Sequence, residues 1–346
     1  MAKKRMRKKD RKFIIICLFI TGLCLCGIGY YYLTNNEEIL EKIIPDNIEK
    51  KKLTIVDEES NERPIAVMYD NNVGYNSHVG LQDSYLNYEM IVEGGLTRIM
   101  ALFKDKDVSL IGPVRSSRHY FLDYALESDA IYCHYGWSDY AKNDINSLGV
   151  NNINGLTDSK AYWRDKKIVA PHNVFTNIDT LYTQASKYSY NVKTSNWRVL
   201  NYDTEEVNLN NKDNVNNVVV NNISLKYSNF HTTSYQYDSD NKYYLRYMDG
   251  KQHIDKITGE QLHYKNIIVM KVRNTTIDSY GRQDLDTVGI GEGYYVTNGY
   301  ATPIKWSKST RKAKTIYLDE NGNEIKVNDG NTFIQIIPIT TTIELS

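Results

Sequence analysis

Residues 87–103 read NYEMIVEGGLTRIMALF, and this stretch decides the fold of the middle of the chain. Two largely apolar runs, residues 87–92 and 97–103, flank the sequence Glu93-Gly94-Gly95. Paired glycines accept the positive φ angles that tight turns require, and apolar runs on either side are typical of paired strands. The stretch therefore predicts an antiparallel hairpin with its turn at Glu93.

The segment around this hairpin, residues 62–188, mixes strand and helix signals. Residues 65–69 form an apolar run that ends at Asp70, as a buried strand does before a turn. Residues 117–127 carry apolar side chains at helical spacing, and Ser138 is placed to cap a second helix that ends at Leu148. A third helix is expected to start at Thr176, because Asp179 stands at the acidic position of a capping box. We expect a mixed α/β first domain over residues 62–188.

The segment from residue 215 to residue 340 has a different pattern, in which apolar residues alternate with polar ones. That period is typical of half-buried strands. The pairs Asp249-Gly250, Asn298-Gly299, Asn321-Gly322 and Asp329-Gly330 punctuate the runs and suit tight hairpins. We expect an antiparallel β-rich second domain, sandwich-like or barrel-like, joined to the first by a linker over residues 189–214.

The N-terminal residues predict a membrane anchor. Residues 13–33 carry no charge and are long enough to cross a bilayer as a helix. Residues 1–12 hold eight basic residues and one acidic residue, which by the positive-inside rule keeps this tail in the cytoplasm. Residues 34–61 interleave acidic and basic residues like a stalk. The expected fold class is α+β with one transmembrane helix, and the bulk of the chain lies outside the cell.

Two other interpretations of the N-terminus stay open. A cleaved signal peptide would need small residues before the cut, and Gly27 and Gly29 are the nearest approach to such a site. Lipidation would need a small residue before the modified cysteine, whereas Ile16, Leu23 and Leu25 precede the cysteines of this segment. The spanning helix is therefore the preferred prediction.

The charge balance and the cysteine content argue against two possibilities, a nucleic-acid partner and an intramolecular disulfide in the part after the apolar segment. The chain has 42 basic and 42 acidic residues, so removing the basic tail leaves the rest with an excess of about seven negative charges. This acidic balance argues against nucleic acid as a partner. Cys133 is the single cysteine outside the apolar segment, which excludes an intramolecular disulfide there. Its neighbours predict a buried strand in which the thiol is a small core side chain.

A series of short motifs follows one another along the part of the chain after the stalk. They are residues 63–68, 80–82, 88–89, 92–98, 111–118 and 171–173, followed by Asp249-Gly250 with His253, Asp255 and Gly259, and then residues 266–269. In this order they resemble the pattern of the YerB-like lipoproteins. The resemblance implies two domains of unknown function on the outside of Gram-positive-type cells. It carries no catalytic residue to this chain, and the lack of a lipobox departs from the family pattern.

Charged residues of the first domain gather at glycine and proline turns, where binding groups tend to collect. Arg98, Arg115 and Arg118 are candidates for a fork that holds a carboxylate or phosphate. Glu93 is the best candidate for a general acid or base, with Asp70 as its partner carboxylate. The structural alternative is that the arginines hold loops and that Glu93 pairs with Arg98 or Arg115 to fix the hairpin.

His134 and His172 complete the candidate ligand-binding group. A metal interpretation is disfavoured, because their spacing of 38 residues matches no ligand signature and no phosphate loop or dinucleotide motif appears. We expect no cofactor and no metal. The aromatic residues Trp137, Tyr140, Trp163, Trp197 and Trp306 suit either sugar stacking or the core, and the core is favoured.

The leading functional hypothesis is a non-enzymatic envelope protein, tethered to the membrane by its helix, that binds a cell-wall glycan or peptide or an envelope protein. A competing hypothesis is a wall-modifying hydrolase that uses Glu93 and Asp70. A third is an assembly factor without a small ligand. Convergence of the seven candidate residues on one surface would favour a binding site over the assembly factor.

Overall fold

A computed structural model describes residues 51–72, 78–210 and 216–346, together with Lys9, Phe19, residues 21–23, Gly27, Tyr30 and Tyr31. The chain divides into two compact units, residues 1–51 and 52–346, and strands β1 to β23 all belong to the second. Within the described residues, no helix is both long and apolar enough to cross a bilayer. Apart from those few residues, the predicted tail and transmembrane segment lie outside the described part of the chain, and so does the predicted stalk up to residue 50.

The compact unit begins earlier than residue 62, the start expected from the sequence. Leu53 and Val56 are buried in its core, and the Asp329 carboxylate accepts hydrogen bonds from the backbone N–H and the hydroxyl of Thr54 at 2.7 and 2.8 Å. The sequence pattern predicted a stalk over residues 34–61, because charged residues of both signs are interleaved there, and only a few residues of the stretch 52–61 are apolar. Residues 52–61 are therefore part of the folded body.

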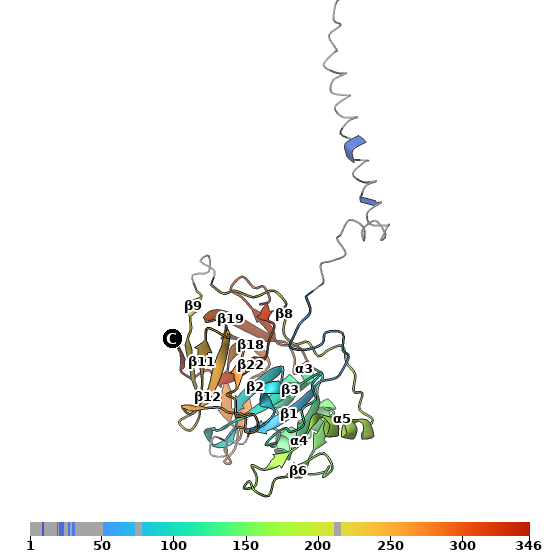
Figure 1. Cartoon of the computed structure of the whole chain (residues 1–346), viewed down its shortest axis with the longest axis vertical. Coiled ribbons are helices and arrows are strands. Elements are labelled where there is room, and N and C mark those ends of the chain that lie inside the picture. The colour runs from blue at the N-terminus through green and yellow to red at the C-terminus, as the bar shows by residue number, and fades with distance from the viewer. Residues whose placement is uncertain are drawn as a thin grey trace, which may run out of the picture. The chain divides into compact units, whose positions relative to one another are not determined.

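One central sheet of eleven strands crosses the body, and Figure 1 shows strands of early and late colour side by side in it. The order is β20-β19-β18-β15-β22-β2-β3-β1-β4-β5, and β9 pairs with β19. The strands are β1 (Ile65–Asp70), β2 (Leu86–Ile91), β3 (Thr97–Phe103), β4 (Ile131–His134), β5 (Asn152–Asn154), β9 (Val218–Val219), β15 (Asn266–Val272), β18 (Gly289–Thr297), β19 (Tyr300–Lys308), β20 (Ile316–Leu318) and β22 (Thr332–Pro338).

A second sheet packs against β22 of the first. Its order is β13-β12-β11-β10-β23, with β14 on β12. Tyr235 and Tyr264 each contact the ring of Phe333 in β22 edge to face, with ring centroids 6.3 and 4.8 Å apart. The strands are β10 (Asn222–Lys226), β11 (Thr232–Asp238), β12 (Tyr243–Met248), β13 (Lys251–Gln252), β14 (His263–Tyr264) and β23 (Ile343–Leu345).

Short strand pairs and helices complete the unit. The pairs are β16 (Asn274–Thr276) with β17 (Gln283–Leu285), β21 (Val327–Asn328) with β8 (Tyr202–Asp203), and β6 (Trp163–Arg164) with β7 (Val174–Phe175). The helices are α3 (Phe121–Glu127), α4 (Asp139–Leu148) and α5 (Ile178–Lys187), with 3-10 turns η2 (Leu81–Asp83) and η3 (Glu93–Gly95).

The predicted hairpin is confirmed. β2 and β3 pair antiparallel with Ile91 opposite Thr97, and η3 forms the turn between them. Gly94 and Gly95 have φ angles of 70° and 73°, a conformation that glycine adopts without strain. Both strands are buried along their whole length, so the hairpin lies at the centre of the sheet.

The helix predictions are confirmed with two corrections. The first helix, expected over residues 117–127, begins at Phe121. The hydroxyl of Ser138 caps α4 by accepting a hydrogen bond from Ala141 N at 3.2 Å, as expected. The third helix is capped by Asn177, whose side chain accepts from Thr180 N at 2.8 Å, and not by Thr176. The Thr176 hydroxyl instead donates to the carbonyl of Ala161 and the residue pairs with Ile111. A tertiary partner thus takes this side chain away from the helix end.

The segment over residues 215–340 is rich in strands, as predicted. Its strands do not pair only with one another in antiparallel fashion, as the prediction of a separate antiparallel domain required. Asp249-Gly250 and Asn298-Gly299 do form tight turns between antiparallel strands, with positive φ at all four residues. However, β22 pairs parallel with both β2 and β15 and so joins the two segments in one sheet. Every residue of β22 is buried, which is typical of central strands with parallel neighbours.

Candidate functional site

The candidate site lies where β1 ends and β3 begins. Asp70, the last residue of β1, stands opposite Arg98 in the antiparallel register. The loop that carries Arg115 follows the same edge, because Arg115 N donates to Met68 O and Asp70 N donates to Pro113 O, both at 2.9 Å. Backbone pairing therefore brings three of the charged residues named from the sequence to one place.

Asp70 is contacted by two of the predicted ligand-binding residues, not by Glu93. His172 Nδ1 contacts Asp70 Oδ2, and Arg115 Nε lies 3.7 Å from the same oxygen. All three side chains are mostly buried, with Arg115 the most exposed at 21%. The structure thus joins residues 70, 115 and 172 in one ion-paired group.

Glu93 is held by Arg118. The guanidinium donates two hydrogen bonds to the carboxylate, from Nε at 2.5 Å and from Nη2 at 2.8 Å. Burial by itself would raise the pKa of Glu93, but the hydrogen bond and charge of Arg118 outweigh it, and the pKa lies below its usual value. The pairing that fixes the hairpin turn therefore exists, with Arg118 as the partner in place of Arg98 or Arg115.

Arg98 is the buried member of the arginine group. Its Nη1 donates to the carbonyl of Ser116 at 2.5 Å. Burial lowers the pKa of Arg98 first, and the nearby charges of Arg118 and Arg115 lower it further, to about 9. Arg98 is therefore a buried guanidinium that lies near two other positive charges.

His134 does not join this group. It is fully buried at the end of β4, where Nδ1 donates to the carbonyl of Gly136 at 2.7 Å and Nε2 lies 3.2 Å from the side-chain amide of Asn152. Burial lowers the pKa of His134 to about 4, so the ring is neutral at physiological pH. These contacts favour a structural role for His134 over ligand binding.

This burial predicts acid sensitivity. An unfolded histidine binds a proton near pH 6.5, whereas folded His134 resists until about pH 4, so its contribution to stability falls as pH drops through this window. Between pH 7 and pH 5 the loss amounts to about 2 kcal/mol. We expect His134→Gln to flatten the pH dependence of the free energy of unfolding, measured by urea titration at both pH values. Equal pH dependence in the two proteins would contradict this assignment.

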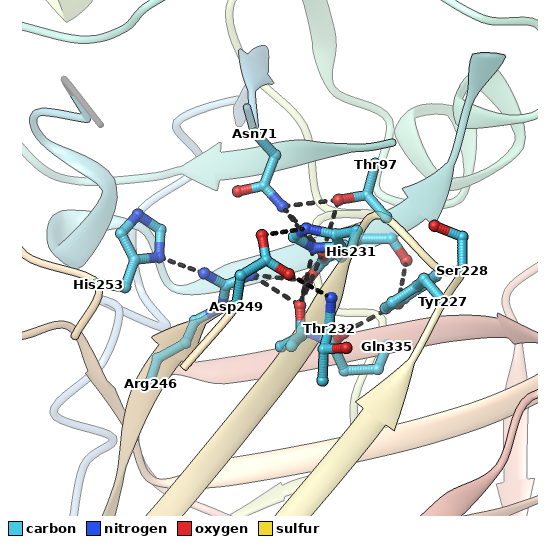
Figure 2. Close-up of polar contacts among 12 residues, drawn as sticks. Asn71, Thr97, Tyr227, Ser228, His231, Thr232, Arg246, Asp249, His253 and Gln335 are labelled. Carbon is cyan, nitrogen blue, oxygen red and sulfur yellow. Dashed lines mark hydrogen bonds and ion pairs between the residues drawn. The ribbon is translucent and has the colours of Figure 1, made fainter. Parts of the chain in front are cut away.

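Sequence reasoning missed a second constellation, centred on Glu89 in β2. The carboxylate is fully buried and lies 2.8 Å from Arg246 Nη2 and 2.8 Å from His231 Nε2. It also accepts hydrogen bonds from Thr97 at 2.7 Å and Thr233 at 3.0 Å. Figure 2 shows Thr97 of β3, Arg246 of β12 and His231, which directly precedes β11, directed toward one centre.

A chain of hydrogen bonds leads from this centre to the candidate site. Arg246 Nη1 donates to His253 Nδ1, a contact visible in Figure 2. Because a guanidinium only donates, His253 carries its proton on Nε2 and donates to His78 Nδ1 at 2.9 Å. His78 Nε2 in turn donates to the carbonyl of Asp70. The buried centre therefore fixes the backbone at the residue that His172 and Arg115 contact.

A sequence signal for the Glu89 centre does exist. Glu89 interrupts the apolar run of β2, and Arg246 interrupts the aromatic run of β12. A charged residue inside a buried strand needs a buried partner of opposite charge. The pattern shows that each residue needs a partner, but it does not identify them as partners of each other.

Other candidate chemistry finds little support. Within residues 51–72, 78–210 and 216–346, no group of three or more His, Cys, Asp or Glu side chains has metal-binding geometry. Cys133 is buried in β4 as predicted, and burial raises the pKa of its thiol. Trp197 and Trp306 are buried in the core, which confirms the core interpretation for these two.

Both halves of the chain match families of proteins of unknown function. Residues 53–191 match the model described as "Protein of unknown function (DUF3048) N-terminal domain", and residues 223–334 match the model of the corresponding C-terminal domain. With the relatives described next, these matches show that the chain belongs to the YerB-like family.

Two relatives extend the comparison over nearly the whole chain. The Bacillus subtilis (strain 168) protein named "Putative lipoprotein YerB" is 26% identical over 329 residues, which cover 92% of this chain and 95% of that protein. The crystal structure of YerB from Bacillus subtilis superimposes with a TM-score of 0.73 at 28% identity. That match covers 82% of this chain and 94% of the crystallised one.

Proposed function

We propose that this protein is a membrane-associated, extracytoplasmic binding protein that recognises an anionic group of an envelope component through Arg98, Arg115 and Arg118. The lipoprotein name of the Bacillus subtilis relative supports the location. The uncharged residues 13–33 after a basic tail support an anchor that crosses the membrane once, with the bulk of the chain outside. The net acidic character of that bulk disfavours nucleic acid as the ligand.

One observation carries the binding proposal. Three guanidinium groups within electrostatic range of one another face two carboxylates, those of Asp70 and Glu93. Burial is the main reason that the pKa of Arg98 is lowered, and the nearby charges of Arg118 and Arg115 lower it further. An incoming anion would offset this mutual repulsion of the three guanidinium groups. Guanidinium forks suit the planar oxygens of carboxylates and the oxygens of phosphates.

Arg115 and Arg118 are the members that a ligand can reach. Both keep part of their side chain exposed, whereas Arg98 is buried. Arg118 is already oriented by its hydrogen bonds to Glu93, and Arg115 Nε lies 3.7 Å from Asp70 without a hydrogen bond to it. Carboxylates that orient an arginine reduce the conformational entropy lost when a ligand binds.

Removal of either exposed charge tests the proposal. The full-length protein in detergent micelles is assayed for binding to purified cell-wall material that retains its phosphate-bearing polymers. We expect Arg115→Gln and Arg118→Gln each to weaken binding about tenfold, because each removes a charge-assisted hydrogen bond.

Arg273→Gln is the matched control, because it also removes one positive charge. Arg273 is exposed, and its Nε lies 3.8 Å from Asp286 Oδ2. Its binding should stay within about twofold of the unaltered protein. Equal weakening by all three variants would indicate a general charge effect and would refute a specific site.

The hydrolase alternative receives no support from this geometry. A general acid must carry a proton near neutral pH, but the bidentate contact with Arg118 keeps Glu93 ionised. Asp70 is bound by His172 and Arg115. Both proposed catalytic carboxylates are thus engaged by cations that hold them in place.

A further inference from the structure

Two loops of the second segment lie against the hairpin turn that carries Glu93. The Ser228 hydroxyl donates to the carbonyl of Gly95 at 2.6 Å. The ring of Phe230 approaches the same glycine so closely that a Cβ there would lie 3.3 Å from its Cδ2 atom. Yet 72% of Phe230 remains exposed, so its ring stands at the surface next to the turn.

The tip of the β16–β17 hairpin lies against the same turn, at Gly94. A Cβ on Gly281 would lie 4.0 Å from Gly94 N. Asp278 holds the tip by accepting from the backbone N–H groups of Tyr280 and Arg282, at 3.0 and 3.1 Å. Tyr280 is 77% exposed and stacks on the Arg282 guanidinium at 5.0 Å, so the ring is ordered although little covers it.

The space beside Gly94 is open. A Cβ on this residue would meet no atom within 4 Å, although Phe230 flanks the next residue and the β16–β17 hairpin touches its backbone. Arg118 holds Glu93 at the start of the same turn. The hydrogen bond to Asp278 is the main cause of the raised pKa of Arg282, and the negative charge of Glu93 also raises it. An open turn is thus bordered by two exposed aromatic rings and by guanidinium groups.

We infer that this surface binds a glycan strand bearing anionic substituents, with sugar rings on Phe230 and Tyr280 and an anionic group at Arg118 and Arg115. This inference rests on the proposed function and adds the ligand class. The C–H face of a pyranose ring is apolar and packs on the π face of an aromatic ring, while its hydroxyls bind the polar groups around it. Ser228 and Asp278 supply such polar groups beside the rings.

The composition of the surface favours a glycan over a protein partner. Protein interfaces have a contiguous apolar core with a polar rim. Here Phe230 approaches the turn at Gly95, and the hairpin tip that carries Tyr280 approaches it at Gly94. The neighbours of these two loops are charged or carry hydroxyls, among them Glu93, Arg282 and Ser228. Isolated rings among polar groups match the alternating apolar and polar character of a sugar chain, and the cations match its anionic substituents.

The test uses the full-length protein in detergent micelles and two probes, wall glycan strands that carry phosphate substituents and inorganic phosphate alone. Binding is measured by isothermal titration calorimetry. The double variant Phe230→Ala with Tyr280→Ala should bind the glycan about tenfold more weakly and bind phosphate as before. Ile290→Ala, which truncates an isoleucine of β18 that is 83% exposed, is the control and should leave both affinities unchanged.

The two proposals fail in different ways. If Arg115→Gln weakens glycan binding and the aromatic double variant does not, the glycan surface is refuted while the anion site stands. If neither variant changes binding of either probe, both are refuted. Because Phe230 and Tyr280 are exposed, their truncation should leave the thermal unfolding midpoint unchanged, and a large drop would assign the rings a structural role and overturn the inference.

Discussion

Replacement of Arg246 by Met is expected to lower the free energy of unfolding by about 3–5 kcal/mol, measured by chemical denaturation of residues 52–346. The Arg246 side chain is fully buried and lies 2.8 Å from the Glu89 carboxylate. Methionine fills similar space but supplies no charge. Glu89 is then left as a buried anion whose remaining hydrogen-bond partners are His231, the Asn71 amide and the hydroxyls of Thr97 and Thr233. The variant should also disturb Asp70, because Arg246 begins the chain of hydrogen bonds through His253 and His78.

The charge state of Glu89 determines how this loss depends on pH. Burial would raise the pKa of Glu89, but the charge of Arg246 and the contacts with His231 outweigh burial and hold the pKa well below its usual value. The stabilisation is therefore present above the ordinary pKa of a glutamate and is lost as pH falls below it. The difference between the unaltered protein and Arg246→Met should shrink on acidification.

Two comparisons separate the ion pair from simple packing. The double variant Glu89→Leu with Arg246→Met removes both charges, and it should be more stable than Arg246→Met alone, since no unpaired ion remains. Arg273→Met changes an exposed arginine in the same way and should alter stability by less than about 0.5 kcal/mol. A double variant as unstable as the single one would show that shape, not charge, determines the cost.

Replacement of Lys308 by Met should have a comparable effect, about 3–5 kcal/mol in the same measurement. The Lys308 ammonium group is fully buried and lies 2.7 Å from Glu127 Oε2 at the end of helix α3. Glu127 also accepts from the Thr315 N–H at 2.9 Å and from the Tyr88 hydroxyl at 2.7 Å. Those neutral donors do not replace a cation, so the variant leaves a buried charge without its partner.

Strand β19 supplies its own control. Lys305 lies in the same strand as Lys308 but is exposed to solvent. We expect Lys305→Met to change the free energy of unfolding by no more than about 0.5 kcal/mol. Equal losses at the two positions would show that burial of the Lys308 pair contributes nothing beyond the effect of altering a lysine in β19.

Both ion pairs connect residues that are distant in sequence. Glu89 and Glu127 belong to the part of the chain matched by the N-terminal family model, and Arg246 and Lys308 belong to the part matched by the C-terminal one. Strand β22 adds backbone hydrogen bonds between the same parts, since it lies between β2 and β15. The candidate binding surface draws on both parts as well, through Arg118 on one side and Phe230 and Tyr280 on the other.

Sequence patterns predicted well whatever depends on neighbours along the chain. The glycines at residues 94 and 95 predicted the turn between β2 and β3 because backbone conformation at a turn is local. Ser138 predicted the start of α4 for the same reason. Six of the seven candidate site residues fall into two ion-paired groups, one at Asp70 and one at Glu93, with Arg98 within electrostatic range of both, whereas His134 contacts neither carboxylate.

Contacts between distant segments were not predictable in this way. Thr176 was expected to cap a helix, but its hydroxyl donates a hydrogen bond to the carbonyl of Ala161 instead. The alternation over residues 215–340 predicted strands correctly but carried no information that β22 pairs with β2. Phe230 and Tyr280 are single aromatic residues in loops, and nothing in their neighbours indicates that both adjoin the Glu93 turn.

The amino-acid sequence by itself determined the turns, most helix and strand positions, the uncharged segment at the N-terminus and the membership of the YerB-like family. Each of these depends on local conformational preference or on motifs read in order. The tertiary structure alone decided that Glu89 pairs with Arg246, that Glu127 pairs with Lys308 and that two loops with exposed aromatic residues adjoin the Glu93–Gly95 turn. The physical reason is that a buried charge requires a partner of opposite sign, but only the folded chain decides which of many distant residues comes close enough to serve.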